Sequence, residues 1–150
     1  MQPCEPSPDS KPVEISLATD LSALAVLARV IQEFGAANAL SEAVQSRLNL
    51  MLDELVTNSI TYALPKVPEP ELRLRLLVDE DSVVAQLEDN GTAFNPFEEA
   101  PEPDPTLRLE DRPIGGLGVF LVKQLADSTA YERVDGRNRI TLRHLIGGES

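Results

Sequence analysis

Apolar residues recur at two different periods along the chain, and the change between these periods separates predicted helices from predicted strands. Between Ser41 and about Leu64 they recur every three to four residues, which predicts one long amphipathic helix ending before Pro65. A second stripe with this spacing predicts a helix from Leu21 to Gly35. Alternation of apolar and polar residues predicts strands at Val13–Leu17, Leu72–Val78, Val83–Glu88, Thr129–Val134 and Arg139–Ile146.

The connections between these segments differ in kind. Asp135-Gly136 joins the last two predicted strands and favours a tight hairpin turn. The acidic, proline-rich stretch Pro96–Pro113 is too irregular for a packed element, and its place between two glycine-containing stretches predicts a lid at about residues 96–118. Residues 1–12 hold four prolines and no apolar period, which predicts a flexible tail. We therefore expect a single domain at residues 13–146.

Composition narrows the classes of function. A hydrophobic content of 42% with 25% charged residues is typical of a folded protein. The net charge of −12 argues against direct binding to nucleic acid or to an anionic membrane, because both need a cationic surface. Cys4 is the only cysteine, and neither a membrane span nor a signal peptide is visible, so a reducing, cytoplasmic setting is expected. His144 is the only histidine and no suitable serine turn accompanies it, which argues against a Ser-His-Asp hydrolase.

Three stretches are candidates for chemistry. Glu54 and Asn58 lie four apart on one side of the long predicted helix, where they can meet a cation, a phosphate or a proton. From this pair alone, a solvated helix edge is the more common interpretation. Asp89-Asn90-Gly91 ends a predicted strand and can direct a side chain into a pocket, although the same tripeptide is also an ordinary turn.

The third stretch is Gly115-Gly116-Leu117-Gly118, which opens directly into a segment with helical spacing. Glycines at a helix N-terminus let backbone amides face an anion such as a phosphate, whereas simple helix packing is the alternative interpretation. The stretch matches neither the Walker loop nor the Rossmann turn.

Taken in order, these stretches resemble the ATP-binding fold of the GHKL superfamily, and within it most closely the anti-sigma-factor serine/threonine kinases of bacterial partner-switching systems. The stretches that carry the resemblance are Glu54–Asn58 with Ala63, Asp89–Pro96, Gly115–Val122, Tyr131–Arg133 and Asn138–Leu142. The resemblance implies an α+β fold, namely a two-layer α/β sandwich whose mixed, mostly antiparallel sheet is covered on one face by helices.

The resemblance also implies roles for individual residues. Glu54 is expected to be the general base and Asn58 the ligand of a magnesium ion that bridges the nucleotide phosphates. Asp89 is expected to accept a hydrogen bond from the adenine amino group, with Thr141 nearby through water and Gly91 allowing the base to approach the backbone. The residues expected along the phosphates are Gly115, Gly116, Leu117 and Gly118, with an arginine of the lid, either Arg108 or Arg112.

The function implied is an ATP-dependent, magnesium-requiring serine/threonine protein kinase and anti-sigma factor. Its partners are expected to be a STAS-type anti-anti-sigma protein, which it phosphorylates, a sigma factor, and a second copy of the chain in a homodimer. The alternative is a regulatory module that sequesters a partner, with ATP as a structural ligand or without ATP. Glu54 favours the kinase over this alternative. The acidic, proline-rich lid and Tyr62, which stands where many relatives have histidine, mildly favour the alternative.

Overall fold

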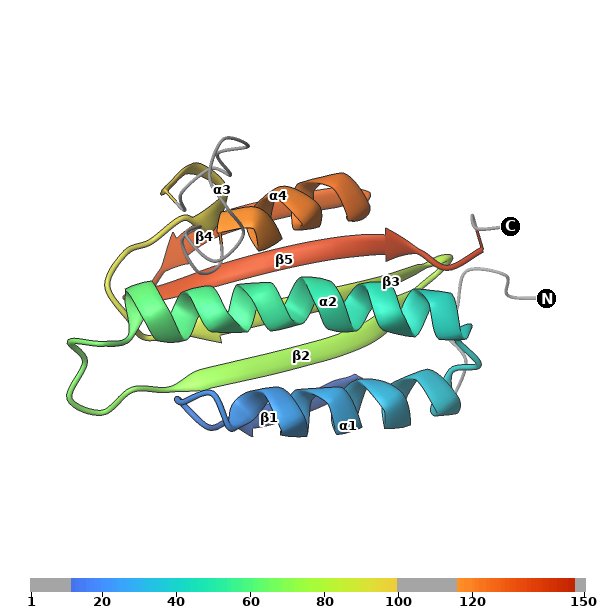
Figure 1. Ribbon diagram of the computed structural model, residues 1–150, viewed down its shortest axis with the longest axis horizontal. Helices are drawn as coiled ribbons and strands as arrows, with labels where there is room; N and C mark the ends of the chain where they lie inside the picture. Colours follow the sequence, from blue (N-terminus) through green and yellow to red (C-terminus); the bar gives the residue numbers. More distant parts are fainter. Residues whose placement is uncertain (1–11, 100–115, 148–150) are drawn as a thin grey trace.

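The computed structural model describes residues 12–99 and 116–147, which form a sheet and a layer of helices (Figure 1). In chain order the elements are β1 (Val13–Leu17), α1 (Ala23–Ala37), α2 (Glu42–Asn58), the π-helix η1 (Ser59–Ala63), β2 (Leu72–Asp79), β3 (Ser82–Asp89), α3 (Pro96–Glu99), α4 (Gly116–Leu125), β4 (Ser128–Val134) and β5 (Arg137–Leu145).

The sheet has the strand order β1-β2-β3-β5-β4, and every pairing in it is antiparallel. The expected two-layer α+β architecture is confirmed, but the expectation of a mixed sheet is wrong. The connection through α4 does join two strands that run in the same direction, β3 and β4. However, β5 lies between these strands and pairs with both of them, so no parallel pair forms.

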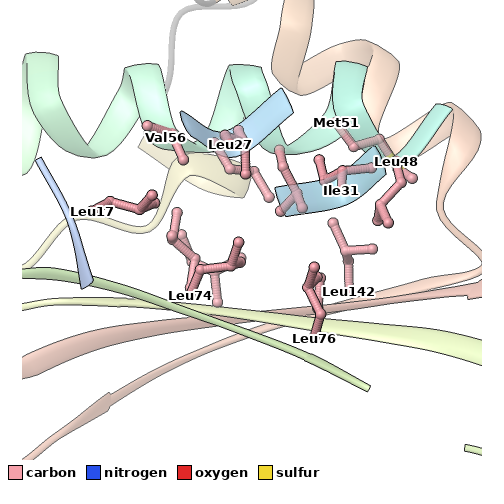
Figure 2. Packing of buried hydrophobic residues seen from close by; sticks show 14 of the residues in the cluster. Leu17, Leu27, Ile31, Leu48, Met51, Val56, Leu74, Leu76 and Leu142 are labelled. Atoms are coloured by element: carbon pink, nitrogen blue, oxygen red, sulfur yellow. The ribbon is translucent and has the colours of Figure 1, made fainter. Parts of the chain in front are cut away.

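One face of the sheet carries the core because apolar side chains alternate along its strands. Leu74 and Leu76 of β2 and Leu142 of β5 are almost fully buried and point towards the layer of helices, which contributes Leu48 and Met51 of α2 to the same core (Figure 2). The other face carries the alternating polar residues, including ion pairs across strands such as Arg75 with Glu14 (3.1 Å) and Arg139 with Glu88 (3.0 Å).

Of the two long helices α1 and α2, only α2 has a side-chain N-cap. Ser41, where the long helix was predicted to begin, is the N-cap of α2 and accepts a hydrogen bond from the Val44 amide at 3.1 Å. The first helix begins later than predicted, with Ser22 at its N-cap and no side-chain cap, and Asp20 instead accepts from the Ser22 amide at 2.9 Å.

A short helix, α3, lies where no packed element is predicted. Asn95 stands before it and accepts from the Phe97 amide at 3.0 Å, while Glu99 accepts from the Asn95 amide at 2.6 Å. This reciprocal capping stabilises a single turn that apolar periodicity does not indicate. Of the predicted lid at about 96–118, residues 116–118 form the start of α4. Residues 100–115 lie outside the described residues, as does the predicted tail up to residue 11.

The predicted hairpin forms between β4 and β5, and the only histidine of the sequence lies in β5. Asp135 and Gly136 have φ angles of 54° and 76°, which the tight turn between β4 and β5 requires. His144 is buried on the core face, where its Nε2 accepts from Arg47 Nε at 3.0 Å, so it is a packing residue. Among the described helices, none combines the length and apolar character needed to cross a membrane.

Candidate functional site

Asn58 is the most unusual polar residue of the helix layer. It ends α2, is 1% exposed, and is followed directly by the π-helix η1, a distortion that is frequent at functional sites. Neither its Oδ1 nor its Nδ2 has a hydrogen-bond partner among the described residues. Leaving such a group buried without a partner costs about 1–3 kcal/mol. The amide is therefore placed to contact something that is not part of the described chain.

Glu54 lies one turn before Asn58 and packs against the start of α4. A Cβ atom added to Gly118 would lie 1.8 Å from Glu54 Oε1 and 2.0 Å from its Cδ. The glycine thus lets the first turn of α4 approach the carboxylate, and the positive end of the helix dipole favours negative charge at this place. The fold therefore brings Glu54 into contact with the glycine stretch.

The surroundings of Glu54 make its carboxylate a stronger proton acceptor than an exposed glutamate. Partial burial raises the Glu54 pKa above its ordinary value of 4.5, and the charge of neighbouring Asp53 raises it further. Burial also raises the pKa of Asp53, although a hydrogen bond from Asn49 (2.9 Å) opposes this shift. Two neighbouring carboxylates are thus held in a partly desolvated environment.

Asp89 ends β3 with its side chain buried on the core face of the sheet. Its Oδ1 accepts two hydrogen bonds of 2.8 Å, one from the Gly91 amide and one from Asn138 Nδ2. Its Oδ2 receives none from the residues that the structure describes. One oxygen of the carboxylate is therefore held by the protein, and the other is left for another donor.

Asn138 holds the loop that follows Asp89. Besides its bond to Asp89, its Nδ2 donates to the Thr92 carbonyl at 2.8 Å. Its Oδ1 accepts from three donors: the Phe94 amide (3.1 Å), the Tyr131 hydroxyl (2.5 Å) and Arg133 Nη1 (3.1 Å). A single buried side chain thus connects residues 89–94 to β4 and β5.

The same loop also contacts the end of the helical segment. A Cβ atom on Gly91 would lie 2.3 Å from the carbonyl oxygen of Ala63, and that oxygen accepts from the Thr92 amide at 2.9 Å. Beside this contact, the rings of Tyr62 and Phe94 stack with their centroids 5.0 Å apart. The end of β3 is therefore fixed against η1, next to Asn58.

The structure brings most of the predicted site residues to three neighbouring places. Glu54 and Asn58 lie on α2, and Gly118 packs on Glu54. Asp89 ends β3, and Gly91 lies in the following loop, which contacts η1. The predicted phosphate contacts Gly116 and Leu117 form the first turn of α4. Gly115 and both predicted lid arginines, Arg108 and Arg112, lie outside the described residues.

Thr141 is not brought to this site. In the register of β3 and β5 it pairs with Gln86, whose Nε2 donates to the Thr141 hydroxyl at 3.2 Å, whereas Asp89 pairs with Asn138. Successive side chains of a strand point to opposite faces, so Thr141 lies three positions away and on the polar face. The position that was expected for Thr141 beside Asp89 is occupied by Asn138.

Asn138, Arg133 and Tyr131 are the residues that the sequence did not assign to the site. The Asp135-Gly136 turn does indicate that Arg133 pairs with Asn138 across the hairpin. Pairing of Asn138 with Asp89 depends instead on the register between β3 and β5, which are separated by α3 and α4 in the chain, and the local pattern carries no signal for it.

Comparisons with known proteins match the chain to one domain family. Residues 17–144 match the family described as "Histidine kinase-like ATPase domain". The serine-protein kinase RsbW of Listeria monocytogenes serotype 4a (strain HCC23) is 29% identical over 107 residues, covering 69% of this chain and 68% of the relative. The serine/threonine-protein kinase BtrW of Bordetella bronchiseptica is 30% identical over 95 residues, covering 63% and 66% respectively.

Solved structures share the fold. The RsbU and RsbW domains of a Mycobacterium tuberculosis protein superpose with a TM-score of 0.63 at 16% identity, and the alignment covers 91% of this chain. This chain spans only 33% of that solved chain. The histidine kinase domain of a blue-light activated kinase from Erythrobacter litoralis superposes with a TM-score of 0.52 at 15% identity, covering 95% of this chain and 66% of that one.

Proposed function

This chain belongs to the histidine kinase-like ATPase domain family, and from this premise we propose that it is an ATP-dependent serine/threonine protein kinase and anti-sigma factor of a partner-switching system. Membership of the family implies ATP binding, and relatives named RsbW and BtrW support a family of partner-switching kinases. The substrate in this proposal is a serine or threonine of a STAS-type anti-anti-sigma protein. A sigma factor is the second partner, and the active form is a homodimer.

The observation that carries the proposal is the unpartnered Asn58 amide, one turn from a half-buried Glu54. A carboxamide oxygen is a ligand that Mg²⁺ accepts, and this ion is usually held by one or two protein groups together with nucleotide phosphates. The residues therefore fit magnesium–ATP, with Asn58 Oδ1 as the metal ligand. When bound, the ion neutralises charge on the phosphates during transfer.

Asp89 and the start of α4 hold the two ends of the nucleotide in this proposal. The unused Oδ2 of Asp89 accepts a hydrogen bond from the adenine amino group. The amides of Gly116, Leu117 and Gly118 face the phosphates, where the dipole of α4 adds to the attraction. Asn58 and Asp89 lie on segments that meet where Gly91 contacts Ala63. The proposed metal ligand and the proposed adenine acceptor are therefore held on connected parts of the fold.

Glu54 acts as the general base. Its carboxylate takes the proton of the substrate hydroxyl while that oxygen forms a bond to the γ-phosphorus, and the bond from phosphorus to the ADP oxygen breaks. A pKa raised by burial suits this role, because general bases are most effective when their pKa lies near the working pH. Removal of a positioned general base lowers the rate of such a reaction by about 10²–10⁴-fold.

The test is transfer of the γ-phosphate from radiolabelled ATP, in the presence of magnesium, to STAS-domain proteins of the same genome. The native protein is expected to label one of them on serine or threonine, and Glu54→Gln is expected to bind ATP with little loss while labelling at least about 100-fold more slowly. Tight ATP binding without any transfer would contradict the kinase and favour a regulatory module that uses ATP as a structural ligand.

A further inference from the structure

The strand β1 lies at one edge of the sheet and pairs only with β2 among the described strands. Its other edge therefore presents backbone N–H and C=O groups that no described strand uses. Such an edge readily pairs with a further strand unless the protein shields it. Residues 1–11, which precede β1, are poorly suited to this pairing, because Pro3, Pro6 and Pro8 have no N–H to donate. The edge is thus available to a strand from another molecule.

An apolar groove of about 280 Å³ lies between β1 and α1, which are neighbours at this edge (Figure 1). Its walls include Val13 and Ile15 of β1 and Val30, Phe34 and Ala37 of α1. The side chains of Val13 and Ile15 point to the same face of the sheet as the helices, because alternate residues of a strand share a face. A strand added beside β1 would place its own alternate side chains over this groove. Its occupant should therefore have apolar residues at every second position.

The sequence of β1 has this alternation and is complementary to itself in one antiparallel register. Directly opposite residues of paired strands point to the same face, so apolar residues must face apolar ones. When Ile15 faces its own copy, Val13 faces Leu17 and Glu14 faces Ser16, and all five residues of the strand pair. When Glu14 faces its own copy instead, two like charges meet, which is unfavourable. The register centred on Ile15 is therefore favoured.

We propose that the occupant of this groove is a second copy of the chain, with the two β1 strands paired antiparallel about a two-fold axis at Ile15. The two five-stranded sheets then join into one continuous sheet, and neither β1 edge remains free. This inference rests on the homodimer of the proposed function and names its interface, but it needs no nucleotide.

The helices beside the joint are complementary as well. Ala37 near the end of α1 and Val13 at the start of β1 line the same groove, so α1 runs antiparallel to β1. The two-fold axis then sets the two α1 helices antiparallel on one face of the joined sheet. Arg29 and Glu33 are exposed one turn apart on α1, and neither forms an ion pair within the described part of the chain. In the dimer, Arg29 of each copy is directed towards Glu33 of the other.

The size of a stable dimer interface also requires the groove. Specific interfaces bury about 1,200–2,000 Å² in total. Two strands of five residues, paired edge to edge, supply only part of this area. The apolar walls of the groove and the flanking side of α1 must therefore be covered too, and homodimer interfaces are typically apolar at their centre.

Ala37→Glu tests the groove. Ala37 is exposed in the single chain, so the change removes no core packing, but it places a carboxylate in the groove that the second copy covers. Burial of this unpaired charge is expected to raise the dissociation constant of the dimer at least about 100-fold. Ala36→Glu is the matched control, because Ala36 is its exposed neighbour on α1 and does not line the groove.

The measurement is sedimentation velocity over a dilution series of the full chain, without nucleotide. The native protein and Ala36→Glu are expected to be dimers with the same dissociation constant, and Ala37→Glu is expected to be a monomer at concentrations where they are dimers. A native protein that stays monomeric, or equal dissociation constants in all three proteins, would overturn the proposal.

A pair of cysteines tests the register. In a Cys4→Ser background, Glu14→Cys combined with Ser16→Cys places opposite thiols about 4.5–5.5 Å apart between their Cα atoms, within the range that a disulfide spans. Each single variant faces its own copy only diagonally, about 7–8 Å away, which is too far. Oxidation is expected to yield a covalent dimer of the double variant alone. Equal cross-linking by a single variant, or none by the double variant, would contradict the register.

These outcomes are separate from those of the kinase. If the native protein is a monomer, the proposed homodimer fails together with this interface, whereas ATP binding and phosphate transfer are judged by their own assays. If the native protein is a dimer but Ala37→Glu does not weaken it, the homodimer stands and only the interface is wrong.

Discussion

Replacing Gly118 by alanine is predicted to slow phosphate transfer about 100-fold without unfolding the protein. The added Cβ atom would lie 1.8 Å from Glu54 Oε1, and ordinary van der Waals contact begins at 3.4 Å, so the carboxylate must move by about 1.6 Å. The atoms in conflict are Oε1, Cδ and Cγ (2.1 Å) of one flexible side chain, which must rotate away from its Cβ outward. Since Gly118 lies inside α4, alanine also favours the helix by up to about 1 kcal/mol.

The substitution is therefore expected to lower the rate of phosphate transfer and to leave the stability of the fold almost unchanged. A misplacement of about 1 Å can lower the rate of an enzyme about 10²-fold. At saturating magnesium–ATP, single-turnover transfer to the STAS-domain substrate is expected to slow by at least that factor. The free energy of unfolding, measured by urea denaturation, is expected to change by less than about 1 kcal/mol.

Two controls show whether Gly118→Ala slows phosphate transfer by moving the Glu54 carboxylate. Gly147→Ala is the matched substitution, because nothing lies within 4 Å of its added Cβ, and it is expected to leave both measurements unchanged. In a Glu54→Gln background, Gly118→Ala is expected to cause little further loss, since the base is already absent. A full transfer rate in Gly118→Ala, or the same 10²-fold loss in both backgrounds, would refute the reasoning.

Three further substitutions probe the fold around the site. Gly91→Ala places a Cβ atom 2.3 Å from the backbone oxygen of Ala63, which cannot rotate away, so it is expected to lower the free energy of unfolding by about 2 kcal/mol; an unchanged urea midpoint would contradict this. Asn58→Leu removes a buried amide without a partner and is expected to raise the free energy of unfolding by about 1–2 kcal/mol. It is also expected to abolish the stabilisation that magnesium–ATP gives in thermal melts. A variant that keeps this stabilisation would contradict the role of Asn58 as metal ligand. Because burial raises the Glu54 pKa above 4.5, the native state binds more protons than the unfolded chain just above this pH, and the native fold loses stability as the pH rises through that window. Glu54→Gln is therefore expected to have a higher free energy of unfolding than the native protein at pH 7 and an equal one below about pH 4.5. Urea denaturation at both pH values tests this, and a larger gain in stability at the low pH would contradict it.

Periodicity in the sequence is enough to predict the elements that carry the site. The stripe around Leu48 and Met51 indicates the helix that places Glu54 and Asn58, and the Asp135-Gly136 turn indicates the final hairpin. In both cases the signal is local, since it depends on residues within a few positions of each other. The short α3 is missed because a single capped turn has no apolar period.

Long-range register limits the rest of the prediction. Choosing Asn138 in place of Thr141 as the neighbour of Asp89 requires the pairing of β3 with β5, and a shift of one residue would move every side chain to the other face. The contact of Gly118 with Glu54 likewise depends on how α4 packs on α2. The resemblance named stretches that the fold brings close together, but only the packing shows which atoms meet.

The most direct test of the account is a calorimetric titration of ATP with magnesium into the native protein and into Asp89→Asn. The account predicts binding by the native protein in the micromolar range and a loss of about 1.5–3 kcal/mol in the variant, because the hydrogen bond to the charged Asp89 Oδ2 is no longer made. No detectable binding by the native protein, or equal affinity in both proteins, would contradict the nucleotide site and with it the kinase.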